Sequence, residues 1–167
     1  QLQVRTRQVD NAALILFSYG ADAIDEGNPY RNQIANQGAF TSLGGPFVID
    51  LLSRAGNLAL SGAWFQKWRV HRFLRPEALG GRIHFHMIGQ RSYELHPDIL
   101  NSAALEVTFQ RNDTYLLPQA YVEGSPTHPS YPAGHGAVAG ACVTVLKAFF
   151  NEEFEIPDPV EANNDGT

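Results

Sequence analysis

The strongest constraint on the fold is the spacing of apolar residues, which recur three and four positions apart in four stretches of the chain. This spacing places side chains on one face of an α-helix. We expect helices over about 10–24, 46–74, 97–110 and 136–150. The segment 26–45, rich in glycine, asparagine, glutamine and proline, has no such period and is predicted to be a long ordered loop. The chain is therefore predicted to be mainly α-helical.

A helix with one apolar stripe must bury it against another helix, so we expect a helical bundle. The chain has 167 residues, of which 44% are hydrophobic and 17% charged. This size and composition predict one helical domain over 1–167 with a packed core. Cys142 lies at a small-residue position of the last helix and is predicted to be a buried thiol. His96 and Pro97 are predicted to cap the third helix.

Composition also narrows the class of partner. The net charge is −5 and the isoelectric point is near 5.6, which argues against a nucleic-acid surface. No uninterrupted apolar segment reaches the ~18 residues that a membrane-spanning helix needs. Residues 1–7 do not have the pattern of a secretory leader. We therefore expect a soluble protein, and the sequence leaves its compartment open.

The most informative motif runs from Thr127 to His135 and reads THPSYPAGH. It brings a histidine and bare backbone amides to the start of the last helix. The first turn of a helix has unpaired N–H groups and a partial positive charge, so it attracts an oxyanion. Gly134, without a side chain, lets the anion approach closely. The motif predicts an anion site that includes His135.

A second motif, residues 67–76, has four cationic side chains within nine residues of an acidic chain. Pro76 disfavours helical geometry at Arg75, so the helix that carries Lys67 should end here. Long side chains from Lys67 and Arg75 could then clamp one anion. Arg69 and Arg72 are interpreted as a solvated face of the helix or as partners for acidic residues.

These two motifs together resemble the vanadium-dependent haloperoxidases and the acid phosphatases that share their site. The bromoperoxidase branch of algae and cyanobacteria is the most similar. The resemblance covers residues 67–76 and 125–150, and more loosely residues 25–30 and 44–46. It implies a bundle of several helices around vanadate, often built into large homo-oligomers, and an extracellular or cell-wall location is compatible with it.

The resemblance also implies a role for each matching residue. Lys67 and Arg75 would bind equatorial vanadate oxygens, and the amide of Gly134 would add a hydrogen bond. His135 would face the apical oxygen and shuttle protons. The family usually has serine where this chain has Ala133, so one hydroxyl hydrogen bond to the cofactor is missing. A charge-assisted hydrogen bond of this kind contributes roughly 1.5–3 kcal/mol.

The implied reaction is the oxidation of bromide by hydrogen peroxide to a hypobromous-acid equivalent, which halogenates small organic acceptors. Lys67 would polarise the peroxide. His128 points to bromide, and Trp64 either lines the halide pocket with it or belongs to the core. The alternative is an acid phosphatase of the same superfamily. Seven residues separate Lys67 from Arg75, where the phosphatases typically have six, and this favours the haloperoxidase.

One family motif has no counterpart in the sequence. The family has a later arginine and the histidine that bonds vanadium, whereas no arginine follows Arg111 and no histidine follows His135 here. No residue of this chain is therefore predicted to bond vanadium directly. We expect a fragment that forms a homo-oligomer or associates with the missing C-terminal portion. The alternative is an inactive scaffold piece.

Two further groups of residues have side chains that metal ions favour. His84 and His86 form a pair that could chelate zinc, but no third ligand is evident. The surrounding residues favour an interior loop. Oxygen ligands from Asp25, Asn28 and Gln33 could bind a structural calcium ion, but the same spacing is common in ordinary turns.

Overall fold

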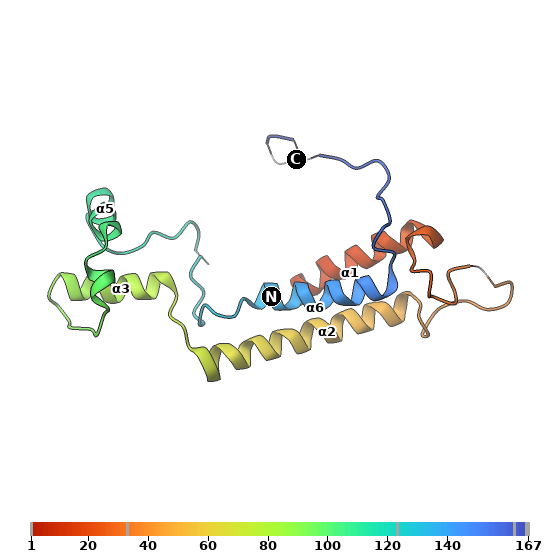
Figure 1. The fold of residues 1–167 in the computed structure, drawn as a ribbon, viewed down its shortest axis with the longest axis horizontal. Helices are drawn as coiled ribbons and strands as arrows, with labels where there is room; N and C mark the ends of the chain where they lie inside the picture. Colours follow the sequence, from red (N-terminus) through yellow and green to blue (C-terminus); the bar gives the residue numbers. More distant parts are fainter. Residues whose placement is uncertain (1, 33, 123, 162, 166–167) are drawn as a thin grey trace. The chain divides into compact units, whose positions relative to one another are not determined.

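The computed structural model describes residues 2–32, 34–122, 124–161 and 163–165, with side chains from Gln8 onward. Its regular structure is helical, with three isolated β-bridges (Figure 1). The predicted mainly α-helical class is confirmed. The chain divides into two compact units, which are residues 1–62 with 134–167 and residues 63–133. The single domain expected over 1–167 stays a prediction. None of the described helices combines the length and apolar character needed to cross a membrane.

The first unit is built from helices at both ends of the sequence. Helices α1, α2 and α6 lie side by side in Figure 1, and α2 continues beyond this unit. The elements are α1 (Leu2–Ser18), a short 3₁₀-helix η1 (Gly20–Ala23), α2 (Gly45–Phe65) and α6 (Gly134–Phe149). The first helix thus starts before the predicted residue 10 and ends at Ser18, because Gly20 takes a positive φ of 78°.

Apolar side chains from these three helices form the core of the first unit. The buried members are Ala13, Val48, Leu52, Leu60, Val138, Cys142 and Phe150. The Cys142 thiol lies 3.7 Å from the carbonyl oxygen of Leu52, so the prediction of a buried thiol is confirmed. A Cβ placed on Gly56 would lie 3.5 Å from that sulfur. Helices α2 and α6 therefore pack closely here.

Backbone hydrogen bonds join the end of η1 to the end of α6. The amide of Asp25 donates to the carbonyl of Phe149 at 3.1 Å, and that of Asn151 donates to Ala23 at 3.0 Å. The segment between η1 and α2 contains turns and two short bridges, as the loop prediction requires. Gly44 is the last residue of this loop. A Cβ on Gly44 would come within 2.5 Å of the backbone of Ala39. Only glycine fits there.

The second unit contains the end of α2 and four further elements. These are a π-helix η2 (Gln66–His71), α3 (Pro76–Met87), α4 (Pro97–Leu100) and α5 (Ala103–Asn112). The predicted helix 97–110 is interrupted between α4 and α5, where the Ser102 hydroxyl accepts a hydrogen bond from Ala104 and caps α5. His96 caps α4 through the amide of Asp98, as expected.

Helix α3 was not predicted, and the interior loop expected around His84 and His86 is wrong. Both histidines lie in α3. Nδ1 of His84 lies 3.2 Å from the Thr114 hydroxyl, and Nδ1 of His86 accepts a hydrogen bond from the amide of Tyr93. Two glycines at 80 and 81 weaken the helical signal, but Gly80 is buried with its Cα facing Leu117. Tertiary packing therefore outweighs helix propensity.

Candidate oxyanion site

The backbone around Lys67 departs from a regular α-helix. The predicted continuous helix to Leu74 is wrong, because a π-helical turn ends at His71. The amide of Arg72 donates to the carbonyl of Lys67 at 3.0 Å, and Arg72 adopts the left-handed conformation with φ of 50°. Turns of this kind are frequent at functional sites. Arg75 is extended, as its position before a proline requires.

Lys67 and Arg75 both contact the segment that precedes α6. The ammonium of Lys67 donates to the carbonyl oxygen of Pro129 at 2.7 Å. Nε of Arg75 donates to the carbonyl oxygen of His128 at 2.9 Å, and Nη2 lies 3.3 Å from Nδ1 of His128. The two cationic side chains that the sequence pairs are therefore brought to adjacent peptide groups within one unit.

Ser130 and Tyr131 fix this segment against the chain after η2. The amide of Ser130 donates to Phe73 at 3.1 Å, and its hydroxyl donates to the carbonyl of Leu74 at 3.2 Å. The ring of Tyr131 packs edge-on against His71, with 4.8 Å between centroids. His71 thus has a structural role. The carbonyls that hold Lys67 and Arg75 are themselves held in place.

The electrostatics of Lys67 favour an anion. Its side chain is only 1% exposed, and among the described residues neither Lys67 nor Arg75 forms an ion pair with a carboxylate. Burial, and then the nearby positive charge of Arg75, lower the pKa of Lys67. A buried cation without a counter-ion is costly. An oxyanion between the two side chains would offset that cost.

A pocket of about 350 Å³ opens beside this pair. Arg75 and His128 line it, together with Trp68 from η2. Trp64 is about half exposed and is not among the described residues that line this pocket. The pairing of His128 with Trp64 in a halide pocket stays a prediction.

The remaining predicted site residues lie at the start of α6. Ala133 directly precedes the helix, Gly134 is its first residue, and His135 is its second and is exposed. The helix has 16 residues, so its first turn presents the free amides that the motif predicts. Lys67, Arg75 and Ala133 belong to the unit 63–133, whereas Gly134 and His135 belong to the other. Convergence of all five on one anion stays a prediction.

The structure gives no support to the other metal sites. Asp25 Oδ1 accepts a hydrogen bond from the amide of Gly27, and Asn28 Oδ1 accepts one from Tyr30, so both side chains serve their own turns. Gln33, the third calcium ligand considered, lies outside the described residues. Within the described part of the chain, no three His, Cys, Asp or Glu side chains are grouped so that they could hold a metal ion.

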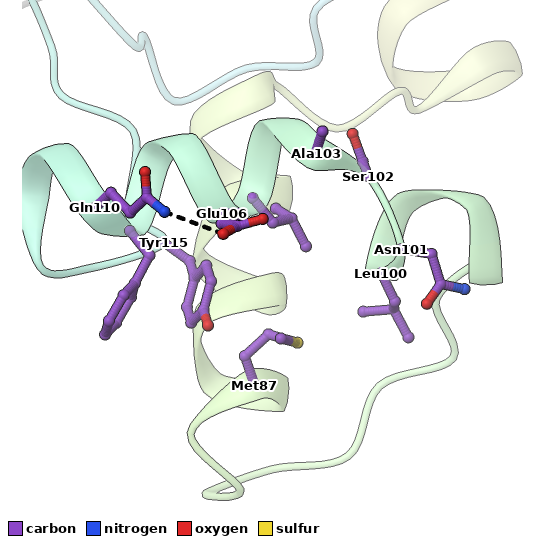
Figure 2. Close-up of a pocket in the computed structure, with 10 residues that line it drawn as sticks. Met87, Leu100, Asn101, Ser102, Ala103, Glu106, Gln110 and Tyr115 are labelled. Carbon is purple, nitrogen blue, oxygen red and sulfur yellow. Dashed lines mark hydrogen bonds between the residues drawn. The ribbon is translucent and has the colours of Figure 1, made fainter.

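A second pocket, of about 590 Å³, lies between the end of α3 and α5. Figure 2 shows Met87 and Tyr115 on one side of it, and Glu106 held by a hydrogen bond of 3.0 Å from Gln110. None of the predicted site residues lines it. Its size alone does not connect it with the oxyanion chemistry.

Sequence reasoning missed three contributors to the site. The carbonyl of Pro129 and the amide of Ser130 are backbone groups, which no residue type reveals, and the Ser130 hydroxyl donates to a backbone carbonyl that the sequence does not single out. Trp68 adjoins Lys67 in the sequence. An aromatic residue within a cationic run was the available signal for it.

Comparison with known proteins confirms the resemblance found in the sequence. The chain is 38% identical to the vanadium-dependent bromoperoxidase of Corallina pilulifera over 93% of its own length, and 37% identical to that of Corallina officinalis over the same share. It is 41% identical to the vanadium-dependent bromoperoxidase of Ascophyllum nodosum over 92% of its length. The chain spans only 29–30% of the length of these relatives. No protein-family model matches it.

Proposed function

We propose that this chain, a relative of the vanadium-dependent bromoperoxidases, supplies part of a vanadate site and takes part in the peroxide-dependent oxidation of bromide. One observation carries the proposal. A buried lysine and a neighbouring arginine lie on adjacent carbonyl groups with no carboxylate partner among the described residues. Such a pair fits a tetrahedral oxyanion with several negatively charged oxygens.

The donors match vanadate in kind. Lys67 provides a compact point charge, and Arg75 provides a planar fork that is always protonated. Arg75 uses Nε and Nη2 for His128, which leaves Nη1 for a ligand oxygen. Ala133, Gly134 and His135 at the start of α6 add amides and a titratable ring. When bound, vanadate supplies the Lewis-acid centre at which hydrogen peroxide is activated toward bromide.

Each residue then has a defined task in the proposed site. Lys67 and Arg75 hold the anion and stabilise negative charge during the reaction. The amide of Gly134 binds a further oxygen. His135 moves a proton as a general acid and base. His128 contacts Arg75 and lines the pocket beside it. Bromide is proposed to bind near His128 and Trp64.

The acid phosphatase alternative is not favoured. The three relatives reported above are all named vanadium-dependent bromoperoxidases. The seven residues between Lys67 and Arg75 also favour the haloperoxidase, as the resemblance implies. Hydrolysis of a phosphate ester by the purified chain, without bromination of a phenol dye, would reverse this choice.

Vanadate binding by the chain itself is the direct test. We expect orthovanadate to bind, with broadening of its ⁵¹V resonance, and Arg75→Gln to weaken binding about 10-fold or more, as the loss of a charge-assisted hydrogen bond predicts. Arg54→Gln is the matched control, because Arg54 pairs with Asp50 on an exposed face of α2. Equal binding by both variants would contradict the site.

Activity requires a separate assay. Bromination of a phenol dye should depend on vanadate, hydrogen peroxide and bromide together. Vanadate binding without bromination would show that this chain supplies the anion-binding part and that the chemistry needs further protein. Bromination that persists without vanadate would refute the proposed reaction.

We also propose that the chain associates with further protein, either as a homo-oligomer or with a polypeptide that corresponds to the rest of its relatives. Large apolar side chains are exposed on the helices, among them Leu14 on α1, and Leu58 and Phe65 on α2. Leu58 is 73% exposed. Contiguous apolar surface marks an interaction face, and we propose that these side chains contribute to one. Light scattering should give a mass above that of one 18.4 kDa chain, and Leu58→Lys should lower it.

A further inference from the structure

The pocket beside Arg75 has the character of a site for an organic molecule. Its volume is about 350 Å³, which lies at the small end of the range for ligand pockets and suits a molecule of one or two rings. Apolar groups make up most of its wall. They come from Trp68 in η2, Leu74 between η2 and α3, Ala78 in α3, and Pro126 and Pro129 in the segment before α6.

The polar groups of this pocket point to an anionic ligand. Arg75 is the only formally charged side chain among the described residues that line it, and His128 stands next to it. Nη1 of Arg75 carries two N–H groups and has no partner in His128, so it can donate a charge-assisted hydrogen bond to an oxygen of a carboxylate or phenolate. Trp68 provides an apolar surface in the same pocket. Its indole ring is about half exposed, and a planar ring can stack on it.

We propose that this pocket binds an aromatic acid, a ring bearing a carboxylate or phenolate group, with the ring against Trp68 and the charged group toward Arg75. That the bound ring is also the acceptor of halogen rests on the proposed function. In that reaction an aryl C–H bond is replaced by C–Br. The hypobromous-acid equivalent loses bromine to carbon, and its oxygen leaves as water with the displaced proton.

The position of the pocket suits that role. Arg75 belongs both to the pocket and to the pair that holds the oxyanion. A ring held there lies next to the place where the oxidant forms. Binding therefore raises the local concentration of acceptor at that place. Trp68, rather than Trp64, becomes the residue that determines which acceptor binds.

The two tryptophans of the chain provide the test. In a ¹H–¹⁵N spectrum of the full chain, Trp64→Phe and Trp68→Phe assign the two indole signals. Titration with benzoate should shift the Trp68 signal in a saturable manner, with a dissociation constant on the order of 1 mM for so small a ligand. The Trp64 signal should stay in place. Benzylammonium, of similar shape and opposite charge, should bind at least 10-fold more weakly.

Three results would contradict benzoate binding in this pocket. The proposal is overturned if neither indole signal moves, if both move equally, or if benzylammonium is as effective as benzoate. Arg75→Gln should remove the preference for benzoate, and the comparison of the two ligands on the unaltered chain holds even if that variant fails to fold. Because no vanadate is present, benzoate binding without vanadate binding would uphold the pocket and contradict the proposed function. Vanadate binding without benzoate binding would support the proposed function and contradict the pocket.

Discussion

Lys67 donates a hydrogen bond to the carbonyl oxygen of Pro129 at 2.7 Å, between residues 62 positions apart in the sequence. This contact joins the π-helical turn to the segment that leads to α6. It also buries a positive charge that a carbonyl dipole alone compensates poorly. The arrangement is explained by ligand binding better than by stability.

Lys67→Met should therefore separate anion binding from stability. It removes a buried cation, which favours the folded state, but leaves the Pro129 carbonyl unsatisfied, which opposes it. These effects offset, so the free energy of unfolding should change by no more than about 1 kcal/mol. Orthovanadate affinity should fall about 10- to 100-fold. Urea unfolding and ⁵¹V NMR measure the two quantities.

The other lysine of the chain is the matched control for that experiment. Lys147 is exposed and pairs with Glu152, so Lys147→Met should leave anion affinity unchanged. A loss of stability well above 1 kcal/mol in Lys67→Met, with unchanged vanadate affinity, would assign Lys67 to the fold instead.

The lowered pKa of Lys67 predicts opposite effects of pH on stability and on anion affinity. Burial and Arg75 move its pKa below the ordinary value of 10.5. As pH rises through the lowered pKa toward 10.5, the unfolded chain holds more protons than the folded one, so folding becomes more favourable. Over the same pH range the amine of Lys67 loses its positive charge, so the affinity of the chain for an anion falls.

Sulfate is the probe for this measurement because its charge is constant in alkaline solution. Its dissociation constant should rise with pH in the unaltered chain, while the free energy of unfolding also rises. The difference between this chain and Lys67→Met isolates the lysine from other alkaline groups. Identical pH profiles for the two proteins would show that Lys67 does not titrate in this window.

Ala133 offers a third prediction, since it directly precedes α6. Serine at this position would cap the helix, which adds about 1 kcal/mol to stability. On the proposed function it would also restore a hydroxyl donor to the anion, so orthovanadate should bind roughly 10-fold more tightly. Capping alone would not change affinity.

Ala133→Asp distinguishes capping from anion binding. Aspartate caps a helix about as well as serine, but its carboxylate repels an oxyanion at the same place. Both variants should therefore unfold at higher urea concentration, while vanadate affinity rises for serine and falls for aspartate. Parallel changes of affinity in the two variants would place Ala133 away from the anion.

The sequence predicted the helical class and the buried Cys142 because each depends on local pattern. Apolar spacing marks α1, α2 and α6, and Pro76 marks the break before α3. What it could not predict depends on tertiary contacts. Helix α3 forms although two glycines lie in it, since Gly80 packs against Leu117.

The candidate site likewise has features that the sequence predicts and features that depend on tertiary contacts. Residue types identified the cationic pair and the amide-rich turn. The π-helical turn at η2 and the bonds from Ser130 to the backbone of Phe73 and Leu74 were not predictable, because any residue supplies a carbonyl group. Trp68 was overlooked in favour of Trp64 because Trp68 lies within the π-helical turn, where an ideal α-helix no longer gives the direction of a side chain.

Two glycines of the first unit should respond oppositely to the same substitution. A Cβ on Gly56 in α2 meets Cys142 and Val138 at 3.5 and 3.6 Å, which are ordinary contacts. Gly56→Ala should therefore stabilise the protein by about 0.5–1 kcal/mol through helix propensity. A Cβ on Gly44 would come within 2.5 Å of the backbone of Ala39, so Gly44→Ala should cost about 1–3 kcal/mol. Urea unfolding measures both, and destabilisation by Gly56→Ala would mean that α2 and α6 pack more closely than this structure has them.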